Sequence, residues 1–375
     1  MTKLKITFLI TREPENASRV FAQTRQRARW IKIIYDVIIV GAGPTGCSAA
    51  KRLATDGFKV LMVEQFKVPL RRIDTCLLIK KTENLIKTYF KTDIPESVTC
   101  SPRIGKGMIL TNDDGKEFKY DQPTLNVWRN LFDMWLIEKA VEAGVEFRDE
   151  TAAVSYEERA SDIILTLRGK TEYAEKAKVI IACDGITGTM KKKVMGKHDE
   201  HVFVYETFNR GAIDLDPDYF YSYLQPDLAE HSAWFNVKDD YLIFGVAGKN
   251  LGKIEHYYKT FINYMKLKHN ARIDMTESQE RWTMPVILPG CPIDYGKGRI
   301  LLAGAAAGFL NPISEGVSAS LECGHAVADA ISKVGNFDMQ EIFAAYKNNV
   351  AELRDYMVRQ WRLLAANSAK FAYMK

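Results

Sequence analysis

The sequence has no run of the roughly 20 apolar residues that a membrane-spanning helix needs. Its longest apolar candidate, residues 300–310, is interrupted by glycine and alanine. Internal repeats and low-complexity tracts are also absent, so a solenoid or a repeat array is not expected. The 375 residues are enough to bury a large core, and they predict two domains, or one domain with a second inserted in it.

Paired cysteines are missing as well. The six cysteines are scattered, with no C-x-x-C pair, and none of the six histidines has the spacing of a metal ligand, so we assign no metal site. No secretory signal with a cleavage site is visible. This pattern predicts a reducing, cytoplasmic setting, with peripheral membrane contact left open. The cysteines are Cys47, Cys76, Cys100, Cys183, Cys291 and Cys323.

Basic charge is lacking in the body of the chain. The formal net charge is +5, but residues 1–34 carry eight Lys and Arg against two Glu, a net charge of +6. The net charge of residues 35–375 is therefore about −1. A nucleic-acid-binding body is therefore not expected. For residues 1–34, contact with an anionic membrane or a partner, joined by Trp30, is one interpretation. We favour the other, an appended basic extension.

A glycine turn at residues 41–46, GAGPTG, lies between a predicted strand at 36–40 and a predicted helix that runs to about residue 56. Gly41 permits the tight turn, Gly43 lets the backbone approach a pyrophosphate, and Gly46 lets the helix pack on the strand. A second strand at 59–63 ends at Glu64, placed to bind an adenosine ribose. Strand, turn, helix, strand and acid together predict a dinucleotide site.

The remaining pattern predicts an α/β fold: a Rossmann-like domain with a parallel sheet, a mostly antiparallel substrate domain and C-terminal helices. Strands are expected at 145–148, 152–156, 163–168, 178–182, 203–210, 220–224, 232–237, 241–246 and 299–303, with a hairpin at 107–120. Helices are expected at 78–89, 126–143, 253–268 and 315–332, and from residue 338 onward. The predicted boundaries are 1–34 for the extension; 35–80, 121–196 and 281–335 for the nucleotide-binding domain; 81–120 and 197–280 for the substrate domain; and 336–375 for the helical tail.

Four separated motifs occur in a characteristic order. They are the glycine turn with Glu64, VWRNLFD at 127–133, CDG at 183–185, and GAAAG at 304–308 followed by Pro312, Glu315 and Gly316. In this order and spacing the chain resembles FAD-dependent enzymes of the p-hydroxybenzoate hydroxylase fold. Residues 76–78 (CLL) and 308–312 (GFLNP) make it most similar to the geranylgeranyl reductase family.

The resemblance implies FAD as the cofactor, with NADPH or another reductant as electron donor. It implies that Gly41, Gly43 and Gly46 hold the pyrophosphate, that Glu64 binds the ribose, and that Arg129 reaches the cofactor. Pro312 would lie by the isoalloxazine, and the helix opening at Glu315-Gly316 would point its positive end at the flavin. The full set of cofactor residues it implies is Gly41, Gly43, Pro44, Thr45, Gly46, Glu64, Gln65, Arg72, Arg129, Asp184, Gly185, Gly304, Ala305, Gly308, Pro312, Glu315 and Gly316.

The chain departs from the family pattern at three places. The family has an aspartate that binds a ribityl hydroxyl where this chain has Ala305. Leu77 and Leu78 replace the glycines that follow the cysteine, so Cys76 is either a proton-donating thiol or a small buried hydrophobe. The aromatic substrate motif survives only as Ala233-Trp234-Phe235, so Trp234 and Phe235 are the candidate substrate contacts; the aromatics of this region are otherwise expected in the core.

Three functions remain open. The first is reduction of carbon–carbon double bonds in an isoprenoid or similar apolar substrate, with hydride from reduced flavin. The second is hydroxylation of an aromatic or polyketide-like ring with NAD(P)H and oxygen. The third is a non-catalytic binding protein in which Ala305 has weakened FAD binding.

Overall fold

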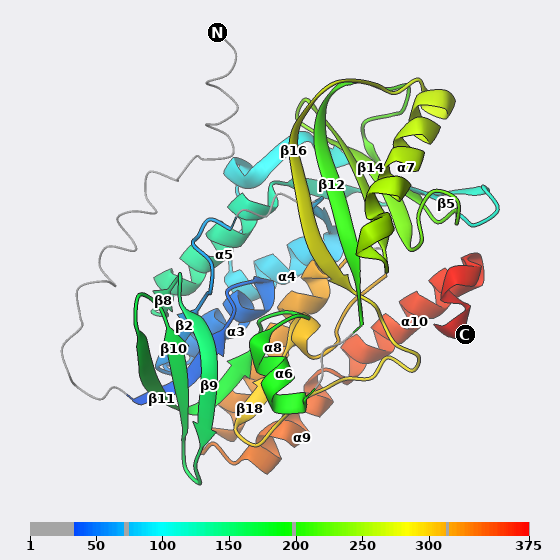
Figure 1. Ribbon diagram of the computed structural model, residues 1–375. Coiled ribbons are helices and arrows are strands. Elements are labelled where there is room, and N and C mark those ends of the chain that lie inside the picture. The colour runs from blue at the N-terminus through cyan, green and yellow to red at the C-terminus, as the bar shows by residue number, and fades with distance from the viewer. Residues whose placement is uncertain (1–33, 71–74, 197–199, 313–314, 375) are drawn as a thin grey trace.

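The computed structural model describes residues 34–374 except 71–74, 197–199 and 313–314. Residues 1–33 of the predicted basic extension and the candidate cofactor residue Arg72 lie outside the described residues. Figure 1 shows two parts, an α/β half that holds the glycine turn and a large twisted sheet above it.

A parallel sheet forms the centre of the α/β half. Its strands run in the order β17-β18-β11-β1-β2-β8, and β9 and β10 extend β11 as an antiparallel hairpin. The central strands are continuous apolar runs, as expected for strands buried on both faces. Their bounds are Ile34–Val40 (β1), Val60–Val63 (β2), Glu146–Arg148 (β8), Ala152–Glu158 (β9), Ile163–Arg168 (β10), Glu172–Ala182 (β11), Gly296–Lys297 (β17) and Ile300–Leu302 (β18).

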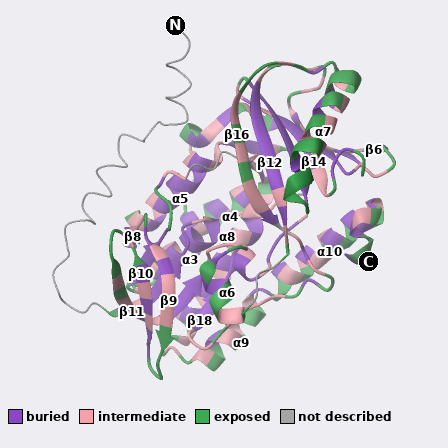
Figure 2. Cartoon of the chain, in the orientation of Figure 1, coloured by how far each residue is buried: buried purple, intermediate pink, exposed green. Residues whose placement is uncertain are grey.

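Helices cover this sheet, and α3 is the one at its centre (Figure 2). Helix α3 packs against both α5 and α8. Gly324 of α8 lies so close to α3 that a Cβ atom there would be 2.2 Å from the Thr45 carbonyl oxygen. Only glycine permits this approach. The bounds are Pro44–Thr55 (α3), Lys80–Phe90 (α4), Arg129–Glu142 (α5), Thr189–Met195 (α6), Val317–Val334 (α8) and, for a 3₁₀ turn before α8, Gly304–Ala306 (η3).

Helices α4 and α5 begin later than the sequence predicts. We expected them at residues 78 and 126, but α4 begins at Lys80 and α5 at Arg129. The residues before each helix instead pair as strands, with Leu78 opposite Leu125. This pairing forms a small sheet of β3 (Leu77–Ile79), β7 (Thr124–Val127) and β4 (Thr99–Gly105), preceded by the turn η1 (Glu96–Val98).

The large sheet has seven strands in the order β16-β12-β15-β14-β13-β5-β6. One face is covered by α7, where aromatic side chains such as Phe235, Phe244 and Phe261 form a core. The other face looks toward the α/β half (Figure 1). The bounds are Gly107–Thr111 (β5), Glu117–Tyr120 (β6), His201–Ala212 (β12), Tyr219–Tyr223 (β13), Ser232–Lys238 (β14), Tyr241–Gly248 (β15), Arg272–Pro285 (β16), Leu251–Lys253 (η2) and Ile254–His269 (α7).

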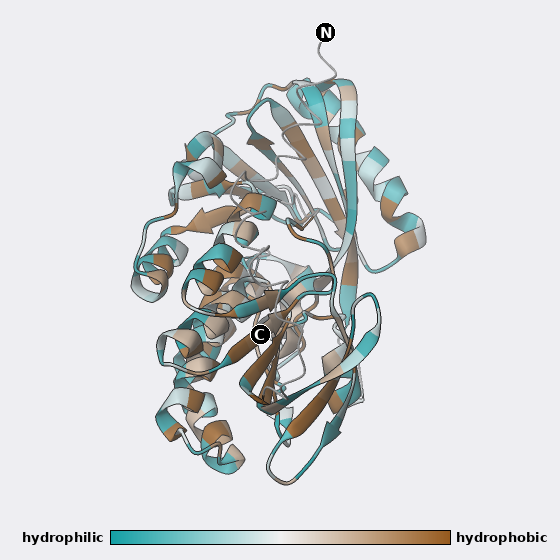
Figure 3. Ribbon diagram, turned by 90° about the vertical axis from the view of Figure 1, so that its left-hand side faces the viewer, coloured by the Kyte–Doolittle hydropathy of each residue, from teal (hydrophilic) through white to brown (hydrophobic). Residues whose placement is uncertain are grey.

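The C-terminal helices bridge the two halves. Trp361 Nε1 donates to the Leu310 carbonyl at 2.7 Å, and Ser368 Oγ donates to Asp113 in the β5–β6 turn at 2.7 Å. In Figure 3, helices carry both hydrophilic and hydrophobic residues, and several strands in the lower half are mostly hydrophobic. The bounds are Met339–Asn349 (α9), Ala351–Asn367 (α10) and Ala369–Met374 (η4).

The predicted domain boundaries stay a prediction. Residues 80–90, which we expected mostly in the substrate domain, form α4 and pack on α8 and α3. Strands β5 and β6, from the same predicted segment, do join the large sheet. In the described part of the chain, no helix combines the length and apolar character that crossing a membrane requires.

Candidate functional site

The glycine turn is shaped by backbone contacts that leave no room for side chains. Gly41 has a φ of +103°, and a Cβ atom there would lie 2.5 Å from the Cys183 carbonyl oxygen. A Cβ atom at Gly46 would lie 2.0 Å from the Gly41 carbonyl oxygen. Gly43 differs, because a Cβ atom added there would meet nothing within 4 Å. The turn is therefore closed on the protein side at Gly41 and Gly46 and open toward a cleft at Gly43.

The N-terminus of α3 faces this opening. Pro44 is its first residue, no side chain caps the helix, and its first turn holds no acidic residue. The unpaired N–H groups and the helix dipole together favour a negative group at this end.

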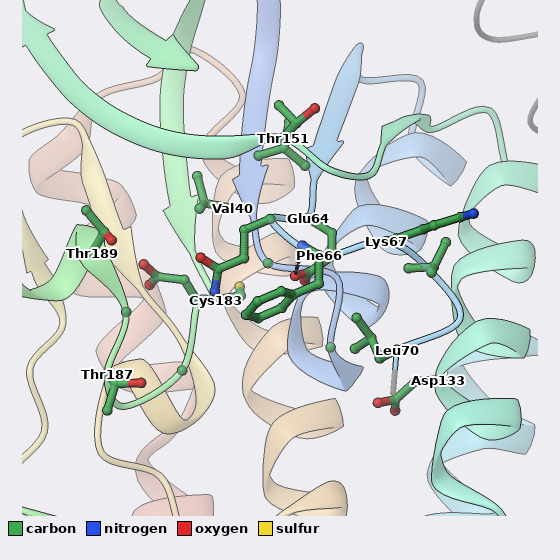
Figure 4. A pocket seen from close by; sticks show the side chains of 18 of the residues that line it. Val40, Glu64, Phe66, Lys67, Leu70, Asp133, Thr151, Cys183, Thr187 and Thr189 are labelled. Atoms are coloured by element: carbon green, nitrogen blue, oxygen red, sulfur yellow. Dashed lines mark hydrogen bonds between the residues drawn. The ribbon is translucent and has the colours of Figure 1, made fainter. Parts of the chain in front are cut away.

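Glu64 directly follows β2 and lines the cleft (Figure 4). Its side chain is buried, and its two oxygens accept hydrogen bonds from the backbone N–H groups of Ala42 and Phe66, both at 3.1 Å. Burial raises the pKa of this carboxyl, although the backbone N–H groups oppose the shift. Gln65 follows it on the cleft wall. The acid is thus fixed at the strand end from which a ribose would be recognised.

Arg129 is the first residue of α5 and borders the same cleft. Its Nε donates to Asp133 Oδ1 at 2.8 Å, one helical turn further along. Asp133 is 2% exposed at its side chain, so the guanidinium is anchored to a buried carboxylate. A fork held in this way suits phosphate or ribose oxygens.

Asp184 and Gly185 follow β11 on the opposite wall. Asp184 Oδ2 accepts a hydrogen bond from the Met190 N–H at 2.8 Å, whereas its Oδ1 is buried without a hydrogen-bond partner in the described part of the chain. Burial raises the pKa of Asp184 to about 6. An unsatisfied buried acceptor beside a cleft indicates a place for a donor group of a ligand.

These residues line one cleft of about 960 Å³, a volume suited to a large cofactor. A second cavity, of about 380 Å³, is lined mainly by apolar and aromatic side chains and includes Trp234, Pro312 and Glu315. Trp282 borders both spaces. Pro312 therefore lies on the second cavity and not in the cleft with Gly41.

Other predicted cofactor residues lie behind the walls. Gly304 has a φ of +63°, and a Cβ atom there would lie 2.1 Å from Thr45 Oγ1. Gly308 has a φ of +102° and backs onto the Pro292 carbonyl. Ala305 is the second residue of η3, and Gly316 immediately precedes α8. These positions shape the turn before α8, and none of them is among the residues that line the cleft.

Two candidate residues do not face the cavity. Cys76 is 3% exposed and packs in the apolar core, while its neighbours Thr75 and Leu77 line the second cavity. This placement favours the buried hydrophobe over the proton-donating thiol. The assignment of Phe235 to the substrate is wrong, because Phe235 lies with Phe244 and Phe261 under α7. Neighbouring side chains of a strand point to opposite faces, so of these two residues Trp234 faces the cavity and Phe235 does not.

Sequence reasoning missed several residues of the site. Glu280 and Trp282 lie on β16, and Thr75 and Glu206 lie on the wall of the second cavity. β16 carries many polar residues and has no clean alternation, so its composition gave no strand signal. Within the described residues, no cluster of three or more His, Cys, Asp and Glu is placed to hold a metal ion.

A comparison with protein families matches residues 34–283 to the FAD binding domain family. The chain belongs to the FAD binding domain family. The match extends over both the glycine turn and most of the large sheet, so FAD is the cofactor of this fold. The cleft fits it, since the open space at Gly43 and the unsatisfied Asp184 oxygen are where a bound dinucleotide would be held.

Among curated relatives, the chain is 25% identical over 350 residues to a digeranylgeranylglycerophospholipid reductase of Methanosarcina acetivorans, covering 86% of this chain and 82% of the relative. It is 27% identical to the Methanocaldococcus jannaschii protein of the same name, covering 81% and 78%. These similarities agree with the resemblance to geranylgeranyl reductases and with an FAD-dependent oxidoreductase.

Among solved structures, a geranylgeranyl bacteriochlorophyll reductase-like protein of Thermoplasma acidophilum superposes with a TM-score of 0.74 at 19% identity, covering 91% of this chain and 88% of that one. A flavin-dependent brominase gives 0.67 at 20% identity, covering 84% and 83%. Aklavinone-11 hydroxylase, solved with FAD and aklavinone, gives 0.64 at 16%, covering 89% and 69%. These neighbours confirm the expected fold class.

A side chain at position 43 should block FAD without disturbing the fold. Gly43→Val fills the open space at the turn, and we expect FAD affinity to fall at least about tenfold, equal to about 1.4 kcal/mol. The melting temperature of the FAD-free protein should stay close to that of the original protein. Equilibrium dialysis and thermal unfolding measure the two effects. Gly46→Val is the contrasting variant, because its Cβ meets backbone, and it should lower the melting temperature. Unchanged FAD binding in Gly43→Val would contradict the site.

The buried Asp184 should make the FAD-free protein less stable at higher pH. Its pKa is about 6 in the folded chain against 3.8 for an ordinary aspartate. Its contribution is therefore fully present below pH 4 and is lost as the pH rises through 6, by about 3 kcal/mol. Asp184→Asn removes this loss. The free energy of unfolding of the variant, measured in urea relative to the original protein, should therefore increase between pH 4.5 and pH 8. A difference that does not change with pH would contradict the assignment.

Proposed function

We propose that this chain is an FAD-dependent reductase that saturates carbon–carbon double bonds in an isoprenoid or similarly apolar chain. The observation that carries the proposal is the second cavity, which is lined by apolar and aromatic groups and shares Trp282 with the cofactor cleft. A lipid-like chain fits such a lining. The names of the curated relatives support the same substrate class.

The chain's own residues supply binding and orientation. The backbone at Gly41 and Gly43 and the N-terminus of α3 would hold the pyrophosphate, and Glu64 would bind the ribose. Arg129, fixed by Asp133, would contact phosphate or ribose oxygens. Bound FAD, once reduced, supplies hydride to the substrate. NADPH or another reductant is the proposed source of its electrons.

Glu315 and Pro312 lie where the second cavity meets the start of α8. Glu315 accepts hydrogen bonds from the Ser318 N–H at 3.0 Å and from Ser318 Oγ at 2.7 Å. Asn311 Nδ2 donates to the same carboxylate at 2.8 Å. The first turn of α8 is thereby held in place, with its positive end toward the region where the flavin ring is proposed.

The runner-up is hydroxylation of an aromatic or polyketide-like ring. It is favoured by the structural similarity to aklavinone-11 hydroxylase, whose structure was solved with FAD and aklavinone. The third hypothesis, a non-catalytic binding protein, rests on Ala305. Peripheral membrane contact stays a proposal that rests on residues 1–34, of which 1–33 lie outside the described residues.

Anaerobic reoxidation distinguishes these functions. The FAD-loaded protein is reduced, mixed without oxygen with a polyprenyl alcohol, and followed by the flavin absorbance. Reoxidation together with a saturated product, identified by mass spectrometry, is the expected result. An unchanged spectrum combined with oxygen consumption stimulated by an aromatic ring would support the hydroxylase instead. Protein that stays colourless with added FAD would support the binding protein.

Restoring the aspartate of the family should tighten FAD binding. A charge-assisted hydrogen bond contributes about 1.5–3 kcal/mol, so we expect Ala305→Asp to lower the FAD dissociation constant about ten- to hundredfold. Fluorescence titration of the FAD-free protein measures it. Ala351→Asp, the same substitution at the exposed start of α10, is the matched control and should leave the constant unchanged. Equal affinity in both variants would show that residue 305 does not reach the cofactor.

A further inference from the structure

A row of residues crosses the large sheet on the face that borders the second cavity. Trp234 of β14 and Glu206 of β12 both pair with Gly245 of β15, which lies between them. A Cβ atom at Gly245 would be 2.1 Å from the Trp234 indole. The missing side chain therefore lets the indole lie across β15 and reach Glu206, to which Nε1 donates at 2.8 Å.

Glu206 is a buried carboxyl group on the cavity wall. Its side chain is 0% exposed, yet it lines the apolar cavity. Thr75 Oγ1 donates to the same oxygen, Oε1, at 2.9 Å and also lies 2.8 Å from Asn236 Oδ1. Because a hydroxyl carries one proton, a second proton must come either from Glu206 or from the Asn236 amide turned round. The carboxyl group of Glu206 is therefore part of a small buried polar cluster with Trp234, Thr75 and Asn236.

The other acid–base groups of this wall are less suited to give up a proton. Glu315 accepts three hydrogen bonds, spread over both of its oxygens, from the Ser318 N–H, Ser318 Oγ and Asn311 Nδ2, and these donors stabilise its ionised form. Burial lowers the pKa of His231 to about 4, so its imidazole is neutral near pH 7. His231 also packs against Phe371 of the C-terminal tail. Cys76 points into the core.

Glu206 also lies close to the cofactor cleft. Its partner across the β12–β16 pair is Glu280, which lines that cleft. Trp282, two residues further along β16, borders both spaces. A substrate chain in the second cavity would thus have this carboxyl on its wall, on a strand pair that also borders the cofactor cleft.

We propose that Glu206 is the acid that protonates the substrate double bond, an inference that rests on the proposed reductase function. One alkene carbon accepts a hydride, with its two electrons, from reduced flavin, and the other carbon accepts the carboxyl proton of Glu206. The carbon–carbon π bond is lost, two C–H bonds form, the flavin is oxidised, and Glu206 is left as a carboxylate that water reprotonates. Trp234 and Thr75 are positioning residues that fix the carboxyl.

The test uses full-length FAD-loaded protein and the isosteric variant Glu206→Gln, whose side-chain oxygen still accepts from Trp234 and Thr75. Glu277→Gln is the matched control. Glu277 is a buried carboxylate of the same sheet that pairs with Arg210 at 2.9 Å and does not line the second cavity. Geranylgeraniol in detergent is the probe. Its binding to oxidised protein is measured by tryptophan fluorescence, and its reduction by anaerobic reoxidation.

We expect Glu206→Gln to bind FAD and geranylgeraniol as the original protein does, but to reoxidise at least about 100-fold more slowly, the usual size of a general-acid contribution. Glu206→Asp should recover part of the rate. In D₂O the original protein should deliver deuterium to one face of the alkene carbon that receives the proton. Residual reduction by the Gln variant should lose this selectivity. Glu277→Gln should match the original protein.

Three outcomes would overturn the inference. Reoxidation by Glu206→Gln at a rate close to that of the original protein would show that the proton comes from elsewhere. A parallel loss of geranylgeraniol binding and rate, without recovery in Glu206→Asp, would make Glu206 a residue that only shapes the cavity. If the original protein itself leaves geranylgeraniol unreduced, the proposed function fails, and the proton-donor role fails with it.

Discussion

The cofactor cleft depends on backbone-to-backbone contact around the start of α3. Side chains are excluded at Gly41 by the Cys183 carbonyl, at Gly46 by the Gly41 carbonyl and at Gly324 by the Thr45 carbonyl. These contacts bring β1, β11, α3 and α8 to one point, where the dipole and free N–H groups of α3 are directed into open space. Glu64 and Asp184 follow β2 and β11, the two strands that flank β1, and so lie on the two walls of that space.

The second half of the molecule is attached beside this point. In the β14–β15 turn, Asp239 accepts from Trp128 Nε1 at 3.1 Å, and the buried Lys238 contacts the Val127 carbonyl oxygen and lies over the Trp128 ring. Trp128 directly precedes Arg129, so the joint between the two halves also fixes the start of α5. The C-terminal helices close the far side through Trp361 and Ser368. The contacts of the β14–β15 turn and those of the C-terminal helices therefore fix the position of the apolar cavity relative to the cofactor cleft.

The sequence predicted the elements whose structure depends on residues close together in the chain. The turn at 41–46, the hairpin of β5 and β6 and the strand–acid pair ending at Glu64 follow from glycine positions and apolar runs. What failed depended on distant contacts. Leu78 and Asn126 are strand residues because β3, which holds Leu78, pairs with β7, which holds Asn126. The side chains of Cys76 and Phe235 are buried because other elements cover the faces to which they point. Glu206 carries no motif at all; its position at a cavity arises from strands that meet only after folding.

The space above Gly245 shows how one missing side chain couples three strands. The Trp234 ring occupies the volume that any other residue at 245 would need, and the ring in turn completes the surroundings of Glu206. None of the three positions can change its size or polarity alone without leaving a clash, a void or a carboxyl that has lost a donor. Homologous chains should therefore keep or replace these three residues together, as a single inherited unit.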